Sequence, residues 1–135
     1  MIERINNKDL RLAIIIRSTY NNNGIEFFSN DNDSQQLGFM TREKGYEIIP
    51  HRHNLIKRKV EVTQEVLFIK SGSVKVDFYD NQENYIKSST LNNGDVILLI
   101  DGGHGFFMLE KSEIIEVKQG PYCENEDKVR FKKKT

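Results

Sequence analysis

The chain has 135 residues, with 20 lysines and arginines against 20 aspartates and glutamates, so its formal net charge is zero. A chain of this length is most simply one domain with a sizeable core. The balanced charge provides no overall field that would attract nucleic acid or anionic lipid. The single cysteine, Cys123, excludes an internal disulfide framework.

Short apolar segments, bounded by Asn, Asp or Gly and rich in β-branched or aromatic residues, predict strands along the whole chain. In chain order the predicted strands are Leu10 to Arg17, Ile25 to Phe28, Gln36 to Thr41, Tyr46 to His53, Val60 to Lys70, Ser73 to Tyr79, Tyr85 to Thr90, Val96 to Ile100, Phe106 to Leu109 and Ser112 to Gln119. No stretch combines helical periodicity with caps, and strands about eight to twelve residues apart are typical of a barrel or sandwich. The pattern predicts one all-β domain.

The N-terminal residues and the apolar segments bear on where the protein is expected to act. No apolar run reaches membrane-spanning length, and the polar N-terminus lacks the apolar core of a signal peptide. We therefore expect a cytoplasmic protein that binds neither a membrane nor nucleic acid, since no helix suited to reading DNA is predicted. The basic stretch Lys128 to Lys134 is predicted to be a solvated tail.

All three histidines occupy positions from which they could share one metal ion. His51 and His53 alternate on a predicted strand and so point to the same face. His104 follows the predicted strand Val96 to Ile100, and Glu65 lies in a segment expected to be buried on both faces. Three imidazoles and one carboxylate suit a divalent transition metal.

Glu65 has an alternative interpretation. A buried carboxylate must be paired, protonated or bound to a cation, and an ion pair with Arg42 or Lys118 would meet that need equally well. Four other polar residues are predicted to bind the hydroxyl or carboxylate groups of a small ligand. These residues are Arg42, Gln64, Gln119 and Tyr122.

The residues around the histidines resemble the two motifs of the cupin superfamily. Those that match the first motif are Gly45, His51, His53, Glu65 and Gly72, with a longer spacer before Glu65. Those that match the second are Gly94, Gly102 and His104, with Ile100 in place of a proline, His104 one residue early and Met108 in place of an asparagine. The resemblance implies a cupin-type double-stranded β-helix, or jelly-roll barrel.

The resemblance also implies a site. His51, His53, Glu65 and His104 would hold a manganese, iron, nickel, cobalt or zinc ion with positions open to water or substrate, and Glu65 and His104 would act in catalysis. The chain is most similar to short single-domain bacterial cupins found near genes for surface-polysaccharide or nucleotide-sugar synthesis, which implies carbohydrate metabolism.

Within this single cupin domain of residues 1–135, we expect a barrel core over about residues 36–120, an N-terminal β-arm over residues 1–35 and a basic tail over residues 123–135. Small cupins usually pair, so a homodimer is expected, with the arm from Leu10 to Phe28 adding strands to a partner's sheet.

Three functions follow from these observations. The first is a metal-dependent isomerase, epimerase or oxygenase that acts on a small polar metabolite such as a sugar derivative. The second is a metal-free sugar-nucleotide isomerase or epimerase in which a histidine is the general base. The third is a module that binds a small ligand without chemistry.

Overall fold

The computed structural model describes residues 1–123 and 126–133. These residues form ten β-strands and no helix, which confirms the all-β prediction. Accordingly, the described part of the chain contains no apolar helix of membrane-spanning length. The strands, in chain order, are β1 (Ile2–Asn7), β2 (Leu10–Ile16), β3 (Gly24–Phe27), β4 (Gly38–Thr41), β5 (Glu65–Ser71), β6 (Ser73–Tyr79), β7 (Tyr85–Asn92), β8 (Val96–Leu99), β9 (Gly103–Met108) and β10 (Glu113–Lys118).

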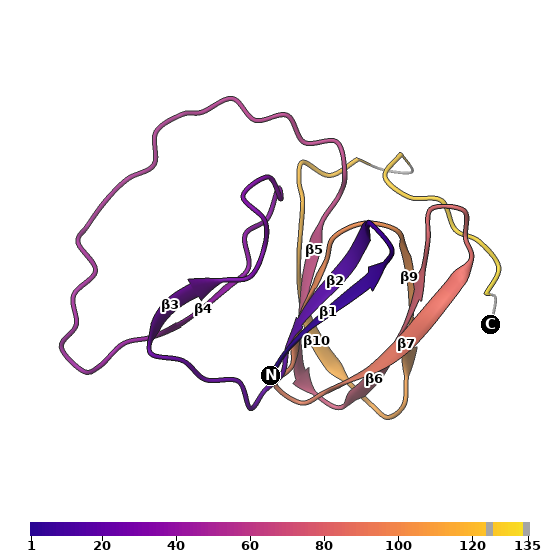
Figure 1. Ribbon diagram of the computed structural model, residues 1–135, viewed down its shortest axis with the longest axis horizontal. Coiled ribbons are helices and arrows are strands. Elements are labelled where there is room, and N and C mark those ends of the chain that lie inside the picture. Colours follow the sequence, from indigo (N-terminus) through magenta and orange to yellow (C-terminus); the bar gives the residue numbers. More distant parts are fainter. Residues whose placement is uncertain (124–125, 134–135) are drawn as a thin grey trace.

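Two open antiparallel sheets face each other as a sandwich (Figure 1). The larger has the strand order β1-β2-β8-β5-β10 and the smaller the order β7-β6-β9. Inward-facing aliphatic and aromatic side chains of both sheets form one buried cluster between them. Its members include Leu12, Leu67, Ile69 and Ile97 from the larger sheet and Val74, Val76 and Phe78 from the smaller.

The outer face of the larger sheet is partly covered by the segment that contains the β3–β4 hairpin. Phe28 and Leu37, at the two ends of the connection between β3 and β4, are buried against Ile14, Ile16 and Leu98 in a second cluster. Strand β2 lies between β1 and β8, so both of its hydrogen-bonding edges are used within the chain. It is therefore not available to a partner's sheet as an arm would be.

The predicted strand from Tyr46 to His53 is wrong. Residues 42–64 form one long connection between β4 and β5 without any strand, and it arcs away from the sandwich in Figure 1. The alternation that suggested a strand is broken by the consecutive Ile48 and Ile49, and Pro50 has no N–H to donate. The longer spacer before Glu65 is thus part of a loop that begins directly after β4.

The C-terminal segment, residues 126–133, packs against the smaller sheet rather than extending into solvent as predicted. The ring of Phe131 meets that of Tyr79 edge to face, with centroids 5.0 Å apart. Lys133 Nζ lies 3.9 Å from Asp77 Oδ2. One aromatic anchor and one ion pair therefore hold this segment on the sandwich. Residues 124–125 and 134–135 of the predicted tail lie outside the described residues.

Candidate functional site

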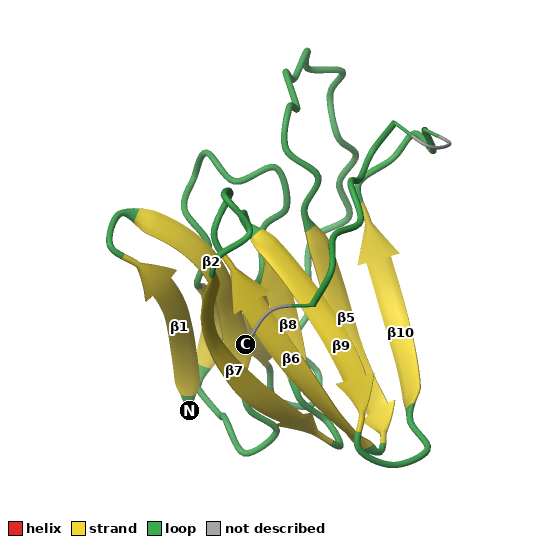
Figure 2. Ribbon diagram, turned by 90° about the vertical axis from the view of Figure 1, so that its right-hand side faces the viewer, coloured by secondary structure: helices red, strands yellow, loops and turns green. Residues whose placement is uncertain are grey.

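The inner faces of three strands, β5, β9 and β10, change from apolar to polar along their length. The polar ends of these strands meet at one end of the sandwich. Strands β5 and β9 begin at this end and β10 ends there, at the top of Figure 2. By strand register, the residues on the inner faces, counted from that end, are Glu65, Leu67 and Ile69 on β5, Lys118, Glu116 and Ile114 on β10, and His104 and Phe106 on β9. Glu116 and Lys118 remain exposed, because β10 is an edge strand of the larger sheet. The apolar members join the core, so a polar layer lies above an apolar floor.

His104 and Glu65 approach each other from opposite sheets across this polar end. His104 Nε2 lies 3.8 Å from Glu65 Oε1, and the two side chains keep 26% and 18% of their surface exposed. The ring of His104 lies 5.4 Å from that of Phe106, on the same face of β9. His104 is thus held against an apolar ring, and both side chains remain partly exposed to solvent.

Burial alters the protonation of both groups. It raises the pKa of Glu65 to about 7, assisted by a side-chain hydrogen bond with Glu116. Burial also lowers the pKa of His104 from its ordinary value. At neutral pH, His104 is therefore an unprotonated acceptor, while a large fraction of Glu65 is a protonated donor. Two neighbouring groups whose pKa values are shifted so that one accepts a proton and the other donates one are typical of acid–base sites.

The structure brings together two of the four predicted metal ligands. His51 and His53 are exposed on the loop over residues 42–64, with ring centroids 5.5 Å apart, and His51 Nδ1 is 2.8 Å from the carbonyl oxygen of Ile49. Within residues 1–123 and 126–133, no cluster of three or more His, Cys, Asp or Glu side chains is arranged to hold a metal ion. The predicted four-ligand site is therefore not assembled in this arrangement.

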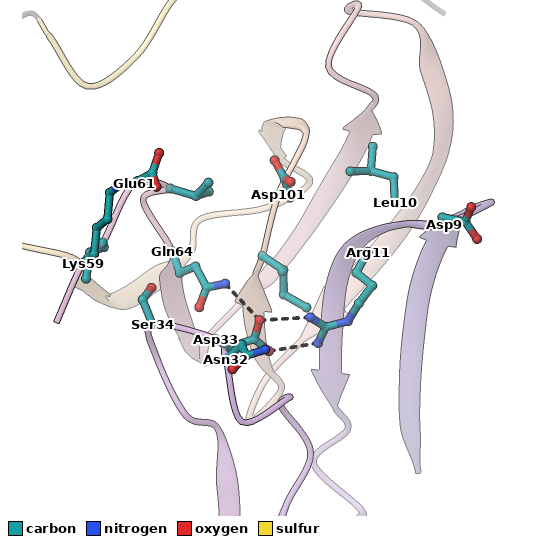
Figure 3. Close-up of a pocket in the computed structure, with 13 residues that line it drawn as sticks. Asp9, Leu10, Arg11, Asn32, Asp33, Ser34, Lys59, Glu61, Gln64 and Asp101 are labelled. Carbon is teal, nitrogen blue, oxygen red and sulfur yellow. Dashed lines mark hydrogen bonds and ion pairs between the residues drawn. The ribbon is translucent and has the colours of Figure 1, made fainter.

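Gln64 precedes Glu65 but belongs to a neighbouring cavity of about 380 Å³. Its side chain points toward Asp33, as does that of Arg11 (Figure 3). Arg11 donates two hydrogen bonds of 2.9 Å to the Asp33 carboxylate, and Gln64 Nε2 lies 3.4 Å from the same group. Because these polar groups satisfy one another, they connect the chain around Asp33 to the sandwich.

The other predicted ligand-binding residues, Arg42, Gln119 and Tyr122, lie in connections outside strands β5, β9 and β10. Arg42 is exposed and its guanidinium stacks 4.4 Å from the ring centroid of Tyr46. Tyr122 is exposed over 80% of its surface. The backbone N–H of Gln119 donates to the Gln64 carbonyl oxygen at 3.1 Å, and its buried Oε1 finds no hydrogen-bond donor among the described residues.

Sequence reasoning missed Glu116 and the position of Lys118. Ile115 and Val117 alternate on one face of β10, and that face is the outer one, where they are 53% and 57% exposed. The consecutive Ile114 and Ile115 make either face of this strand equally apolar at its start. Only the pairing of β10 with β5, which sets Lys118 opposite Glu65, decides which face is internal.

Comparison with family models, with curated proteins and with solved structures finds no match for the chain. The resemblance to cupins therefore rests on the sequence motifs.

Proposed function

We propose that the chain is a cupin-type jelly-roll protein that moves a proton on a small polar metabolite, such as a sugar derivative, in an isomerase or epimerase reaction. The observation that carries this proposal is the approach of His104 to Glu65 from opposite sheets, 3.8 Å apart above an apolar floor. The two facing antiparallel sheets and the matches to both cupin motifs support the jelly-roll assignment.

The proposed reaction uses the two groups in complementary roles. Neutral His104 accepts a proton from a carbon next to a carbonyl group, and the protonated carboxyl of Glu65 donates one to the carbonyl oxygen. In the isomerase form, the histidine returns its proton to the former carbonyl carbon of the resulting enediol, while the neighbouring enediol hydroxyl gives its proton to Glu65, so that a hydroxyaldehyde becomes a hydroxyketone and no proton is gained or lost overall. Before substrate binds, Glu116 accepts the hydrogen bond from protonated Glu65, and the substrate carbonyl oxygen then replaces Glu116 as the acceptor.

The first prediction concerns exchange of a substrate carbon-bound proton with solvent. In deuterated water, wild-type protein is expected to incorporate deuterium next to the carbonyl of one member of a panel of aldoses, ketoses and nucleotide sugars. His104→Gln and Glu65→Gln should each slow this exchange by about 100-fold or more, since positioned acid–base groups contribute about that much. Proton NMR measures the exchange. Retention of the wild-type rate in His104→Gln would rule the proposal out.

A metal-dependent form of the same function is the second candidate, supported by the adjacent His51 and His53 on the loop that leads to Glu65. Manganese, iron, nickel, cobalt or zinc would suit those imidazoles. No catalytic step is assigned to an ion, because these two residues do not join Glu65 and His104 in this structure. The same assay separates the two forms: His51→Gln and a chelator should leave the acid–base reaction intact, but both should abolish a metal-dependent one.

The second prediction concerns stability as a function of pH. Because the pKa of Glu65 is raised to about 7 in the folded state, its ionisation opposes folding, so its contribution to stability falls as the pH rises from about 4.5 to 7. Glu65→Gln removes this penalty. The variant should therefore gain free energy of unfolding relative to wild type at pH 8, and gain less at pH 5.

Urea unfolding at both pH values measures this difference. His104 titrates in both proteins, with a lowered pKa that weakens the fold as the pH falls, so comparing them largely cancels its contribution. Glu61→Gln is the matched control, because Glu61 is exposed and its only described ion pair is with the exposed Lys59. An equal gain at both pH values would contradict the raised pKa of Glu65.

A further inference from the structure

The outer face of the larger sheet carries an uncovered apolar patch on β5 and β10. Phe68 and Ile115 are cross-strand neighbours in this patch, as are Val66 and Val117. The second cluster covers the outer face over β2 and β8 and reaches only as far as Val66, so the other three side chains stay exposed. Strand β10 is also an edge strand of the sheet. An apolar face that extends to an open edge is typical of an interaction surface.

The loop over residues 42–64 leaves both its apolar side chains and its backbone to water. Every residue from 42 to 62 is exposed, and the large apolar ones are Tyr46, Ile48, Ile49, Leu55, Ile56, Val60 and Val62. Over residues 47–63, no backbone group forms a hydrogen bond with the backbone of another described residue. A connection of this length without secondary structure is uncommon in a compact domain, and its row of exposed apolar side chains favours packing against a partner.

The apolar patch and the loop lie on the same side of the molecule. Figure 1 shows the β3–β4 hairpin and the loop on the outer side of the larger sheet, away from the smaller sheet. The outer face of the smaller sheet is instead partly covered by the C-terminal segment, through Phe131 and Lys133. One side of the chain therefore carries both an uncovered sheet face and an extended apolar segment of the kind that covers such a face.

We propose that two copies of the chain form a dimer in which the loop over residues 42–64 of each copy packs on the outer face of β5 and β10 of the other. A two-fold dimer of this kind covers both surfaces of both copies at once, whereas a different partner on the sheet face leaves the loop exposed. The formal net charge of zero means that two copies do not repel each other. The inference goes beyond the proposed function, because it uses neither His104 nor Glu65.

Sedimentation velocity of the full-length protein tests the dimer. Over a concentration range of about 1 to 200 µM, the wild type should pass from monomer to dimer with a Kd of about 10 µM or lower. Ile115→Asp places a charge in the apolar patch, and Leu55→Ser combined with Ile56→Ser removes two apolar side chains from the loop. Each change occurs twice in a two-fold dimer, so a loss of about tenfold per copy should raise the Kd by about 100-fold or more.

Two matched controls carry the same kinds of change outside the proposed interface. Phe107→Asp puts a charge on an exposed apolar position of β9 in the smaller sheet, and Val129→Ser removes an exposed apolar side chain from the C-terminal segment. Both should leave the Kd within about twofold of wild type, since neither residue contacts the partner. Circular dichroism verifies that the Ile115→Asp protein is folded, and the loop variant changes no residue of a strand, so it tests the dimer even if Ile115→Asp unfolds.

Mixing the two variants tests whether the loop of one copy meets the sheet of the other. A heterodimer of the Ile115→Asp chain and the loop variant has one fully wild-type contact, because the intact loop of the first packs on the intact sheet of the second. Its Kd should therefore be about tenfold lower than that of either variant alone. Packing of the two sheets face to face, without the loop, predicts no such recovery.

Several results would overturn the inference. A wild-type protein that stays monomeric up to about 200 µM would leave the patch to a different protein or to the loop of the same chain. A dimer that the loop variant does not weaken, or a mixture that associates no better than its components, would exclude exchange of the loop. Equal effects of Phe107→Asp and Ile115→Asp would mean that added charge, and not the outer face of β5 and β10, accounts for the result.

Discussion

Gly102→Ala is expected to destabilise the protein by about 3 kcal/mol and to disturb the pairing of His104 with Glu65. Gly102 has a φ of +75°, in the left-handed region that residues with a Cβ rarely adopt. An alanine Cβ at this position would lie 2.5 Å from the backbone carbonyl oxygen of Tyr79 and would also meet the side chain of Leu12. A carbonyl in a paired strand cannot rotate away.

The expected displacement reaches the site because Gly102 immediately precedes β9. Tyr79 belongs to β6 in the smaller sheet and Leu12 to β2 in the larger, so an added methyl group at Gly102 presses against both sheets at once. Relief requires a shift of the start of β9, where His104 lies two residues later. The variant should therefore show a lower free energy of unfolding and a lower rate of proton exchange.

Gly105→Ala is the matched control for this prediction. Gly105 lies in the same strand, has no φ in the left-handed region, and would place its Cβ with no atom within 4 Å. Its free energy of unfolding should differ from that of wild type by less than about 0.5 kcal/mol. Urea unfolding compares the three proteins. A similar loss in both variants would show that the close contacts of Gly102 are not the cause.

Asp95→Asn is expected to cost about 3 kcal/mol of stability, the loss typical of breaking a buried charge pair by removing one partner. The Asp95 side chain is only 4% exposed and lies at the turn into β8. Its carboxylate accepts hydrogen bonds of 2.9 Å from Arg17 Nη1, 2.8 Å from the Ser18 backbone and 2.8 Å from the Asn92 backbone. All three partners are donors.

An asparagine has the same shape as aspartate but cannot accept all three of these hydrogen bonds. Its amide has one acceptor oxygen, so the nitrogen would face at least one of the three donors and leave it unsatisfied. Arg17 would also lose its buried counter-charge and keep only Glu3, which lies at the same end of the pairing of β1 with β2. The substitution therefore loosens the connection between the end of β2 and the turn into β8.

Thermal and urea unfolding measure the loss. Asp31→Asn is the control, since Asp31 is exposed and the same change of charge there should alter the free energy of unfolding by less than about 0.5 kcal/mol. Equal effects of the two substitutions would mean that net charge, and not the three hydrogen bonds of Asp95, accounts for the result.

Local sequence pattern predicted most of the strands, because the hydrophobic pattern that marks each strand lies within its own residues. Ser73–Tyr79 alternates along its whole length, and the apolar run at Val96–Leu99 is bounded by turn residues, so neither needs information from elsewhere. Strand β1 (Ile2–Asn7) was missed, because its polar sequence becomes a strand only by pairing with β2. Tyr46 to His53 was predicted as a strand from its own pattern, but no described strand pairs with it.

The candidate site was likewise predicted from local sequence only in part. His104 and Glu65 were identified from residue type and motif spacing, since both concern the chain itself. The partners that shift their pKa values, Glu116 and Lys128, come from β10 and the C-terminal segment, and no local pattern links either to Glu65.

The sequence by itself determined an all-β protein, its strand-forming segments and the two residues that approach across the sheets, because hydrophobic period and side-chain chemistry are local properties. The tertiary structure decided which face of β10 is internal, where residues 42–64 and 126–133 lie, and which charges surround His104. Those outcomes depend on strand register and on packing between segments distant in the chain, and neither is encoded in any short stretch of residues.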